Sequence, residues 1–128
     1  MRLLLDTHLL LWTAAGFGRL SATARALIDD PTNQLFFSTV NIWEIVIKRG
    51  RRHADFQVDP RLLRRNLLNN GYSELGVTGD HALAVEDLPA LHRDPFDRLL
   101  IAQSVVEGIT LLTADRMIAR YPGPIQRV

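Results

Sequence analysis

The sequence predicts an α/β protein in which a short central parallel sheet is covered by helices on both faces, a three-layer α/β/α arrangement. Short, wholly apolar runs alternate along the chain with segments of helical character. Such runs are typical of strands that are buried on both faces, and strands that alternate with helices form parallel sheets. The 128 residues contain no internal repeat and no linker-like stretch. We therefore expect a single domain over residues 1–128.

The predicted strands are runs of leucine, isoleucine, valine and phenylalanine with polar or glycine residues around them. They cover residues 3–5, 35–37, 75–77, 109–112 and 125–128. Arg2 opens the first run and Asp6 closes it directly. The shortness of the runs is what a small parallel sheet requires.

The predicted helices are bounded by capping residues, prolines and glycines. Ser21 is a good N-cap, and Asp59 and Asp94 are each followed by a proline at the first helical position. Gly108 lies just past the end of the helix that Asp94 opens. The helices are expected over residues 9–15, 22–30, 42–50, 60–69, from Thr78 or Asp80 to about 86, 95–106 and 115–120. Residues 51–59 are expected to form a polar loop.

Composition excludes several kinds of function. The chain has no cysteine, which rules out thiol catalysis, thiolate metal sites and disulfides, and which fits a reducing, cytoplasmic compartment. No apolar stretch is long enough to span a membrane, so no membrane association is expected. The formal net charge is +1, but residues 48–65 carry seven basic and two acidic side chains. This basic segment fits a phosphate-bearing or acidic partner, and a solvated helix face is the alternative.

Two acids follow directly on predicted strands. Asp6 comes after residues 3–5, and Asp115 comes two residues after the Thr113 that ends the apolar run at 109–112. In open α/β sheets, ligands bind beyond the C-terminal ends of the strands. Both side chains are therefore expected at the same edge of the sheet.

Three further acids add to this group. Glu44 lies among apolar residues on its helix, where an unpaired carboxylate is costly, so it needs either an arginine partner or a metal ion. Asp94 is an N-cap, and Asp97 three residues later occupies a position where a cap prefers Glu or Gln. Several acids without cysteine or a histidine-rich motif indicate Mg²⁺ or Mn²⁺ rather than zinc. Two such ions about 4 Å apart can activate a water molecule and stabilise a leaving oxygen.

Four segments, in order, resemble the PIN-domain proteins and specifically VapC-type toxins of VapBC toxin–antitoxin pairs. The first runs from Leu3 to Trp12 and includes Asp6-Thr7-His8. The others are Ser38–Ile45 followed by Lys48, Arg93–Gln103, and Leu111–Asp115. Together they extend over residues 2 to about 118, which is nearly the whole chain.

The resemblance implies a metal-dependent endoribonuclease that hydrolyses RNA phosphodiester bonds and leaves a 5′-phosphate. It assigns catalysis and the binding of Mg²⁺ or Mn²⁺ to Asp6, Glu44, Asp97 and Asp115. Asp94 then acts as a cap or outer helper, and Thr7 and Thr113 orient a metal, a water molecule or a phosphate. The implied partners are a VapB-type antitoxin and a second copy of the chain in a homodimer. The basic segment matches no family motif, and we expect four of its arginines to hold the RNA backbone: Arg49, Arg51, Arg52 and Arg61.

Two other functions remain open at this level. One is a non-catalytic α/β binding module whose acids are caps and salt bridges. The other is an aspartate-phosphorylated domain of the receiver or phosphohydrolase kind, which the presence of His8 two residues after Asp6 and of a single lysine, Lys48, argues against. Trp12, Trp43 and Phe96 are expected in the core, His8 as a packed residue and His92 as a loop residue.

Overall fold

A computed structural model describes residues 1–16 and 18–128. Within these residues, five parallel strands form one sheet in the order β3-β2-β1-β4-β5. The strands are short, as the sequence predicts: β1 (Arg2–Leu5), β2 (Gln34–Ser38), β3 (Ser73–Leu75), β4 (Thr110–Thr113) and β5 (Ile125–Arg127). Leu4 of β1 lies in register with Phe36 of β2 and Leu111 of β4. The central strand is thus the first one in the sequence.

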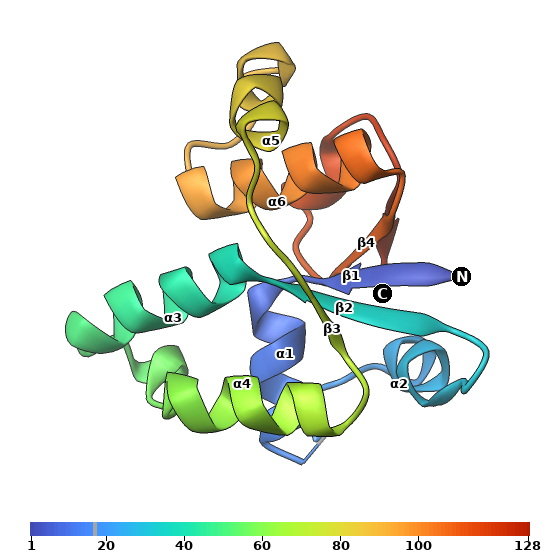
Figure 1. Ribbon diagram of the computed structural model, residues 1–128, viewed down its shortest axis with the longest axis vertical. Coiled ribbons are helices and arrows are strands. Elements are labelled where there is room, and N and C mark those ends of the chain that lie inside the picture. The colour runs from blue at the N-terminus through green and yellow to red at the C-terminus, as the bar shows by residue number, and fades with distance from the viewer. Residues whose placement is uncertain (17) are drawn as a thin grey trace.

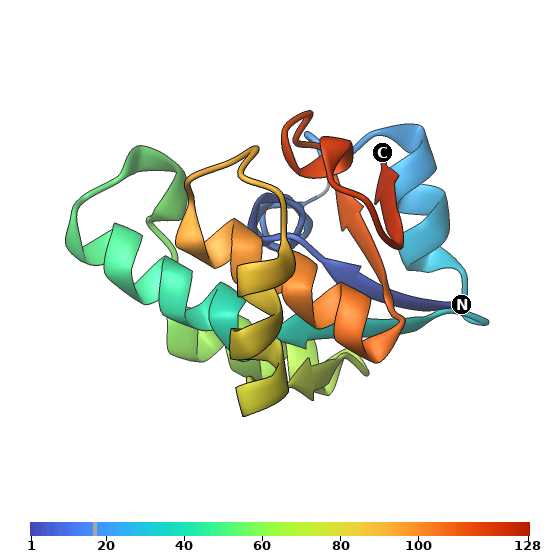
Figure 2. The same ribbon diagram turned by 90° about the horizontal axis from the view of Figure 1, so that it is seen from above.

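Helices cover both faces of this sheet, which confirms the predicted three-layer α/β/α fold (Figure 1). One layer contains α1 (Thr7–Ala14), α2 (Ala22–Asp29) and α4 (Pro60–Asn69). The opposite layer contains α5 (Gly79–Ala84) and α6 (Pro95–Glu107), and the view from above shows them crossing the sheet (Figure 2). α3 (Thr39–Gly50) continues from the end of β2 and projects beyond the sheet.

Alternate residues of β1 belong to the two different cores. Leu3 and Leu5 pack with α1, α2 and α4, whereas Leu4 packs with the residues of α6 and β4. Successive side chains of a strand point to opposite faces, so a wholly apolar strand must be covered on both. All three leucines are fully buried. The run of leucines near the N-terminus therefore specifies a strand that helices must cover on both faces.

Helix boundaries agree with the capping residues in the sequence. Ser21, Asp59 and Asp94 each accept a hydrogen bond from backbone N–H groups in the first turn of α2, α4 and α6. Thr78 rather than Asp80 caps α5. Gly108 ends α6 in the left-handed conformation, with φ of 65°, which glycine adopts at little cost.

Several local predictions are wrong. β3 comprises Ser73–Leu75 and pairs with residues 36–38 of β2, so it lies two residues before the predicted 75–77. The expected helix at 115–120 is only a 3₁₀ turn, Ile118–Arg120, which ends at Tyr121 because a residue before proline, here Pro122, favours extended backbone.

The segment at 51–59 is also more ordered than a polar loop. It contains a 3₁₀ turn, Ala54–Phe56, that buries Phe56. The expected helix that ends near 86 is α5 followed by a second 3₁₀ turn, Val85–Asp87. No helix in the described part of the chain has both the length and the apolar character to cross a membrane.

Parallel strands bring distant acids to one edge of the sheet. β1 leads into Asp6, β2 into α3 and β4 into Thr113 and the residues after it. α3 and α6 also contact each other, so Glu44 and the start of α6 approach the same edge.

Candidate metal centre

Asp6 is held at the end of β1 by donors from two separate elements. One carboxylate oxygen accepts the Leu9 N–H at 2.9 Å and caps α1, and the other accepts the Thr113 hydroxyl of β4 at 2.5 Å. The residue is only 4 % exposed. Burial raises its pKa above the ordinary value, although both hydrogen bonds act in the opposite direction. Asp6 is therefore a fixed acid at the inner end of the site.

Glu44 is the second buried acid, at 2 % exposure. Its Oε1 accepts the Thr7 hydroxyl at 2.5 Å, and the Thr7 oxygen in turn accepts the Asn41 side-chain N–H at 2.9 Å. Thr7 follows Asp6 directly, so this chain of hydrogen bonds joins the end of β1 to α3.

The charged partner of Glu44 is Lys48, one helical turn later, and not the arginine that the sequence suggested. The Lys48 ammonium lies 2.5 Å from Glu44 Oε2 and 3.6 Å from the Asp94 carboxylate. Burial lowers the pKa of Lys48, but the hydrogen bond to Glu44 and the charges of Glu44, Asp94 and Asp97 outweigh it and raise the pKa overall. A cation thus already lies among the acids.

The start of α6 supplies a second group of ligands. Asp94 caps this helix by accepting the Phe96 and Asp97 N–H groups. Asp97 does not bond back to the cap; its Oδ2 lies 2.8 Å from His92 Nε2. Burial and the neighbouring charges of Asp94 and Glu44 raise the pKa of Asp97 to about 7. These carboxylates therefore crowd one another.

Asp115, the fourth predicted acid, is connected to the other acids less directly. Its N–H donates to the Thr113 hydroxyl oxygen at 3.0 Å, so one threonine links it to Asp6. Its carboxylate is exposed and accepts the Met117 N–H at 2.7 Å. Thr113 thus organises two of the predicted acids through a single hydroxyl.

Hydrogen bonds and charge interactions connect the four predicted acids. Their carboxylates do not all contact one common group. Within residues 1–16 and 18–128, the group of three ligands whose atoms approach within 4.8 Å of one another is His92, Asp94 and Asp97. Carboxylate oxygens with one imidazole are donors that suit Mg²⁺ or Mn²⁺. Burial, and then the charges of Asp94 and Glu44, raise the pKa of Asp97, so its charged form is disfavoured there. The residues therefore fit a divalent cation.

Three residues in this network were not predicted as part of it. Asn41 binds both the Ser38 N–H and Thr7, and its position three residues after the Ser38 cap was a usable signal. Lys48 stands four residues after Glu44, the spacing of a helical ion pair. His92 was expected as a plain loop residue, and no sequence spacing indicated its contact with Asp97.

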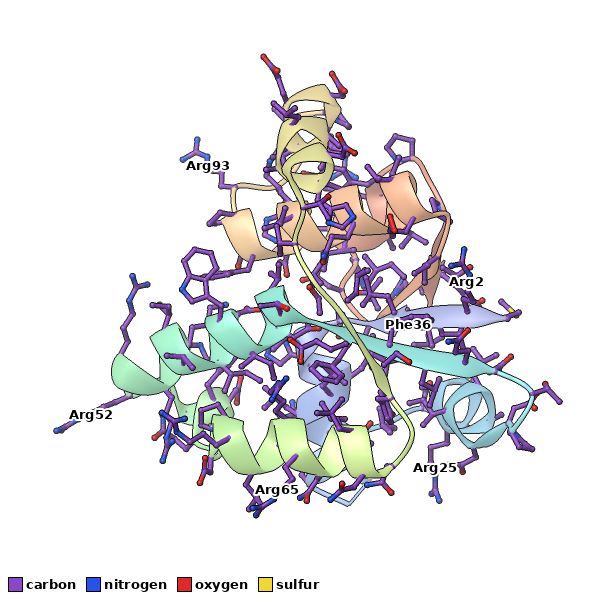
Figure 3. The ribbon with its side chains drawn as sticks, in the orientation of Figure 1. Arg2, Arg25, Phe36, Arg52, Arg65 and Arg93 are labelled. Atoms are coloured by element: carbon purple, nitrogen blue, oxygen red, sulfur yellow. The ribbon has the colours of Figure 1, made fainter. Side chains whose placement is uncertain are left out.

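The basic segment lies beyond the end of α3 and on α4. The four arginines predicted to hold RNA are all exposed: Arg49, Arg51, Arg52 and Arg61. Arg52 extends away from the end of α3, and Arg65 extends away from α4 (Figure 3). These side chains are accessible to a large partner.

The aromatic residues differ from the prediction at one position. Trp12 is half-buried against the core, as expected. Trp43 is 55 % exposed and contacts Phe96 edge to face, with ring centroids 5.0 Å apart. The expectation of a buried Trp43 is wrong because it lies on the face of α3 that points away from the sheet.

A groove of about 670 Å³ lies away from these acids, between α1, α2 and α4. It is lined mainly by apolar side chains, including Leu35, Leu62 and Leu67. The buried Tyr72 hydroxyl has no hydrogen-bond partner there, and burial with the nearby Asp29 charge raises its pKa to about 12. The groove contains none of the predicted acids, so it is separate from the candidate metal centre.

Comparison with known proteins decides the family. A model of the PIN domain matches residues 3–124. The chain belongs to the PIN domain family. The predicted resemblance is confirmed.

The relatives of this PIN domain agree with that assignment. Ribonuclease VapC22 of Mycobacterium tuberculosis is 28% identical over 125 residues, which are 95% of each chain. VapBC2 from Rickettsia felis, solved with a DNA fragment from its promoter, matches with a TM-score of 0.73 and 12% identity over 100% of this chain and 99% of the other. DNA-bound VapBC from Salmonella typhimurium matches with a TM-score of 0.68 and 14% identity over 99% and 98%. The two structures support the fold.

Proposed function

We propose that this PIN domain, as a single domain over residues 1–128, is a metal-dependent endoribonuclease and the toxin of a toxin–antitoxin pair. The observation that carries the proposal is the convergence of Asp6, Glu44, Asp94 and Asp97 on one edge of the sheet, where burial, and then the charges of Asp94 and Glu44, raise the pKa of Asp97 to about 7. The relative named Ribonuclease VapC22 supports the same activity.

In this proposal, Mg²⁺ or Mn²⁺ is held by four acids: Asp6, Glu44, Asp97 and Asp115. Asp94 and His92 lie beside these ligands. When bound, the cation makes a water molecule more acidic and stabilises charge on the phosphate during hydrolysis. Thr113 and Leu9 keep Asp6 in place, and Thr7 keeps Glu44 in place. Each inner acid therefore keeps its position whether or not the cation is present.

Lys48 has a separate role. Its ammonium neutralises Glu44 and approaches Asp94, so it lowers the repulsion among the acids before the cation binds. Arg49, Arg51, Arg52 and Arg61 contact the RNA backbone from the outer end of α3 and from α4.

The proposed partners are a VapB-type antitoxin and a second copy of the chain, acting in the cytoplasm. Two of the similar structures are VapBC complexes. The groove between α1, α2 and α4 offers apolar surface for such a partner. A segment of the antitoxin that carries an arginine would compete with the cation for the same carboxylates.

The test is cleavage of single-stranded RNA by the purified protein in Mg²⁺ or Mn²⁺, with EDTA as the metal-free control. Cleavage is expected only with the divalent cation, and the products should carry 5′-phosphates, which ligation can detect. The same cations should raise the melting temperature. A protein that neither cleaves RNA nor responds to the cations would be the non-catalytic binding module.

The aspartate-phosphorylated alternative predicts a different result. A small phosphodonor would label Asp6 in that case. Asp6 is almost completely buried and both of its oxygens already accept hydrogen bonds, so we expect no labelling. Mass spectrometry after incubation with acetyl phosphate measures this directly.

A further inference from the structure

The exposed aromatic pair beside the acids has no role in the proposed chemistry. Trp43 and Phe96 immediately precede Glu44 and Asp97 in the sequence, so each aromatic residue lies next along its helix to one acid of the candidate metal centre. Their rings meet at 75° with centroids 5.0 Å apart. Because Phe96 meets the indole edge to face and Trp43 is 55 % exposed, a broad part of the indole is open to solvent.

We infer that Trp43, supported by Phe96, is the stacking platform for an unpaired base of the RNA next to the bond that is cut. This inference rests on the proposed ribonuclease function. Single-stranded nucleic acids are held by aromatic rings that stack on bases together with cations that follow the backbone. α3 carries both kinds of group, because Trp43 lies in its second turn and Arg49 at its end.

The charged side chains near the pair argue against a protein interface. The Lys48 ammonium lies 5.7 Å from the centre of the Phe96 ring, and Glu44 and Asp97 adjoin the two rings in sequence. The centres of protein interfaces are depleted of charged side chains. Exposed apolar residues also occur elsewhere, on α5 and α6, where Leu83 and Val106 are exposed. The ring pair therefore resembles a base-binding site more than a subunit contact.

Val46 provides a matched control for this inference. It lies one turn after Trp43 on the same helix and is exposed to a similar extent, at 48 %. No described ring contact involves it. A base stacked on the indole would depend on Trp43 and not on Val46, whereas a subunit interface on this face of α3 would depend on both.

The first experiment measures RNA cleavage by wild type and by Trp43→Ala, Trp43→Phe and Val46→Ala, with single-stranded RNA octamers of random sequence as substrate. Loss of one stacked base should lower kcat/KM by about 5- to 100-fold in Trp43→Ala. Trp43→Phe retains a ring and Val46→Ala leaves the platform intact, so both should stay within about threefold of wild type. Equal activity of Trp43→Ala and wild type would overturn the inference.

The second experiment measures base contact without catalysis. The double variant Trp12→Phe/Asp6→Asn has Trp43 as the single tryptophan of the chain and should not cleave the RNA probe. Its fluorescence should be quenched by random RNA octamers in Mg²⁺ and not by an abasic octamer of the same backbone. Equal quenching by both probes, or quenching by neither, would overturn the inference.

The two experiments separate this inference from the proposed function. If the wild type cleaves no RNA, the proposed function fails, while the fluorescence titration still decides whether a base contacts Trp43. If the wild type cleaves RNA and Trp43→Ala does so equally well, only the stacking platform fails. Conversion of a dimer to monomers by both Trp43→Ala and Val46→Ala, measured by light scattering, would assign this face to a second copy and overturn the inference.

Discussion

Asp6 directly follows β1 and Glu44 lies in the middle of α3, and both are buried, whereas Asp94 and Asp97 lie at the half-buried start of α6. The two inner acids are supplied with donors by the chain itself, from Thr113, Leu9, Thr7 and Lys48. The outer acids face each other and Glu44, and the pKa of Asp97 rises to about 7 as a result of burial and these charges.

The different surroundings of the two groups of acids indicate different roles. An acid whose oxygens all accept hydrogen bonds can be buried in place without a metal ion. Acids that crowd one another keep an excess of negative charge that a divalent cation would relieve. In the proposed metal centre, the inner pair would therefore fix the geometry, and the outer pair would supply much of the electrostatic attraction for the cation. Four predictions test this comparison, from the largest expected effect to the smallest.

The largest effect is expected from Asp6→Asn. The substitution keeps the size of the side chain and one accepting oxygen but removes its charge, so RNA cleavage should fall about 1,000-fold or more while folding is retained. Cleavage rates in Mg²⁺ and the melting temperature measure the two properties. Asp87→Asn, at an exposed acid away from the site, is the control and should keep full activity. Wild-type cleavage by Asp6→Asn would remove the inner pair from catalysis.

A large loss of stability is expected from Lys48→Met. The change leaves the buried Glu44 carboxylate without its ionic partner and should lower the free energy of unfolding in EDTA by about 2–4 kcal/mol. Mg²⁺ should restore more stability to this variant than to wild type, because a cation replaces the missing ammonium. Denaturant unfolding measures both, and Lys48→Arg is the control that keeps the charge. Unchanged stability of Lys48→Met in EDTA would show that the inner acids do not depend on this pair.

The outer acids should make the stability of the metal-free protein depend on pH. The pKa of Asp97 is about 7 in the folded protein and ordinarily 3.8, so the folded state binds more protons than the unfolded state between these values. The free energy of unfolding should therefore fall as the pH rises from about 4 to about 7, and then level off. Asp97→Asn should reduce this slope, to which the buried Asp6 also contributes, and should stabilise the protein at pH 8 in EDTA by about 1–3 kcal/mol.

Unfolding curves measured in EDTA at several pH values test the prediction for Asp97. Asp87→Asn should keep the slope of the wild type. Added Mg²⁺ at pH 8 should stabilise the wild type more than Asp97→Asn. A variant that loses stability at pH 8 would mean that the Asp97 charge is favourable even without a cation.

The smallest effect is expected from the basic segment, which changes RNA affinity without touching either group of acids. Alanine at Arg49, Arg51, Arg52 or Arg61 should weaken RNA binding a few-fold and lower the slope of log K against log salt by about 0.7 for each phosphate that the variant no longer neutralises. Fluorescence anisotropy at several salt concentrations measures the slope. Arg65→Ala, on the side of α4 that faces solvent, is the control (Figure 3). The stabilisation by Mg²⁺ should stay unchanged in all of these variants.

Much of the fold could be predicted because its signals are local. The leucines of β1 are apolar at every position, and the N-caps Ser21, Asp59 and Asp94 satisfy backbone groups within a few residues of themselves. The errors arose where a distant contact decided the local structure. β3 starts at Ser73 because its partner in β2 sets the register, and the turn at 54–56 exists because Phe56 reaches the core.

The candidate site shows the same limit. The acids could be named from their positions after strands and caps, but their partners could not. Asp6 and Thr113 are separated by 107 positions, and Thr7 and Glu44 by 37. The exposure of Trp43 was missed for a related reason, because the apolar residues around it on α3 do not reveal which face of the helix turns away from the sheet.

The order of apolar runs, caps and acids along the chain was sufficient to specify a parallel α/β/α sandwich with carboxylates beyond the ends of its strands, since each of these features depends on neighbours within one turn or one strand. Only the tertiary structure decided that Lys48 lies between Glu44 and Asp94, that His92 meets Asp97, and that the indole of Trp43 faces solvent beside them. Hydrogen bonds and charge interactions act across space between side chains that packing brings together, and linear spacing does not record that distance.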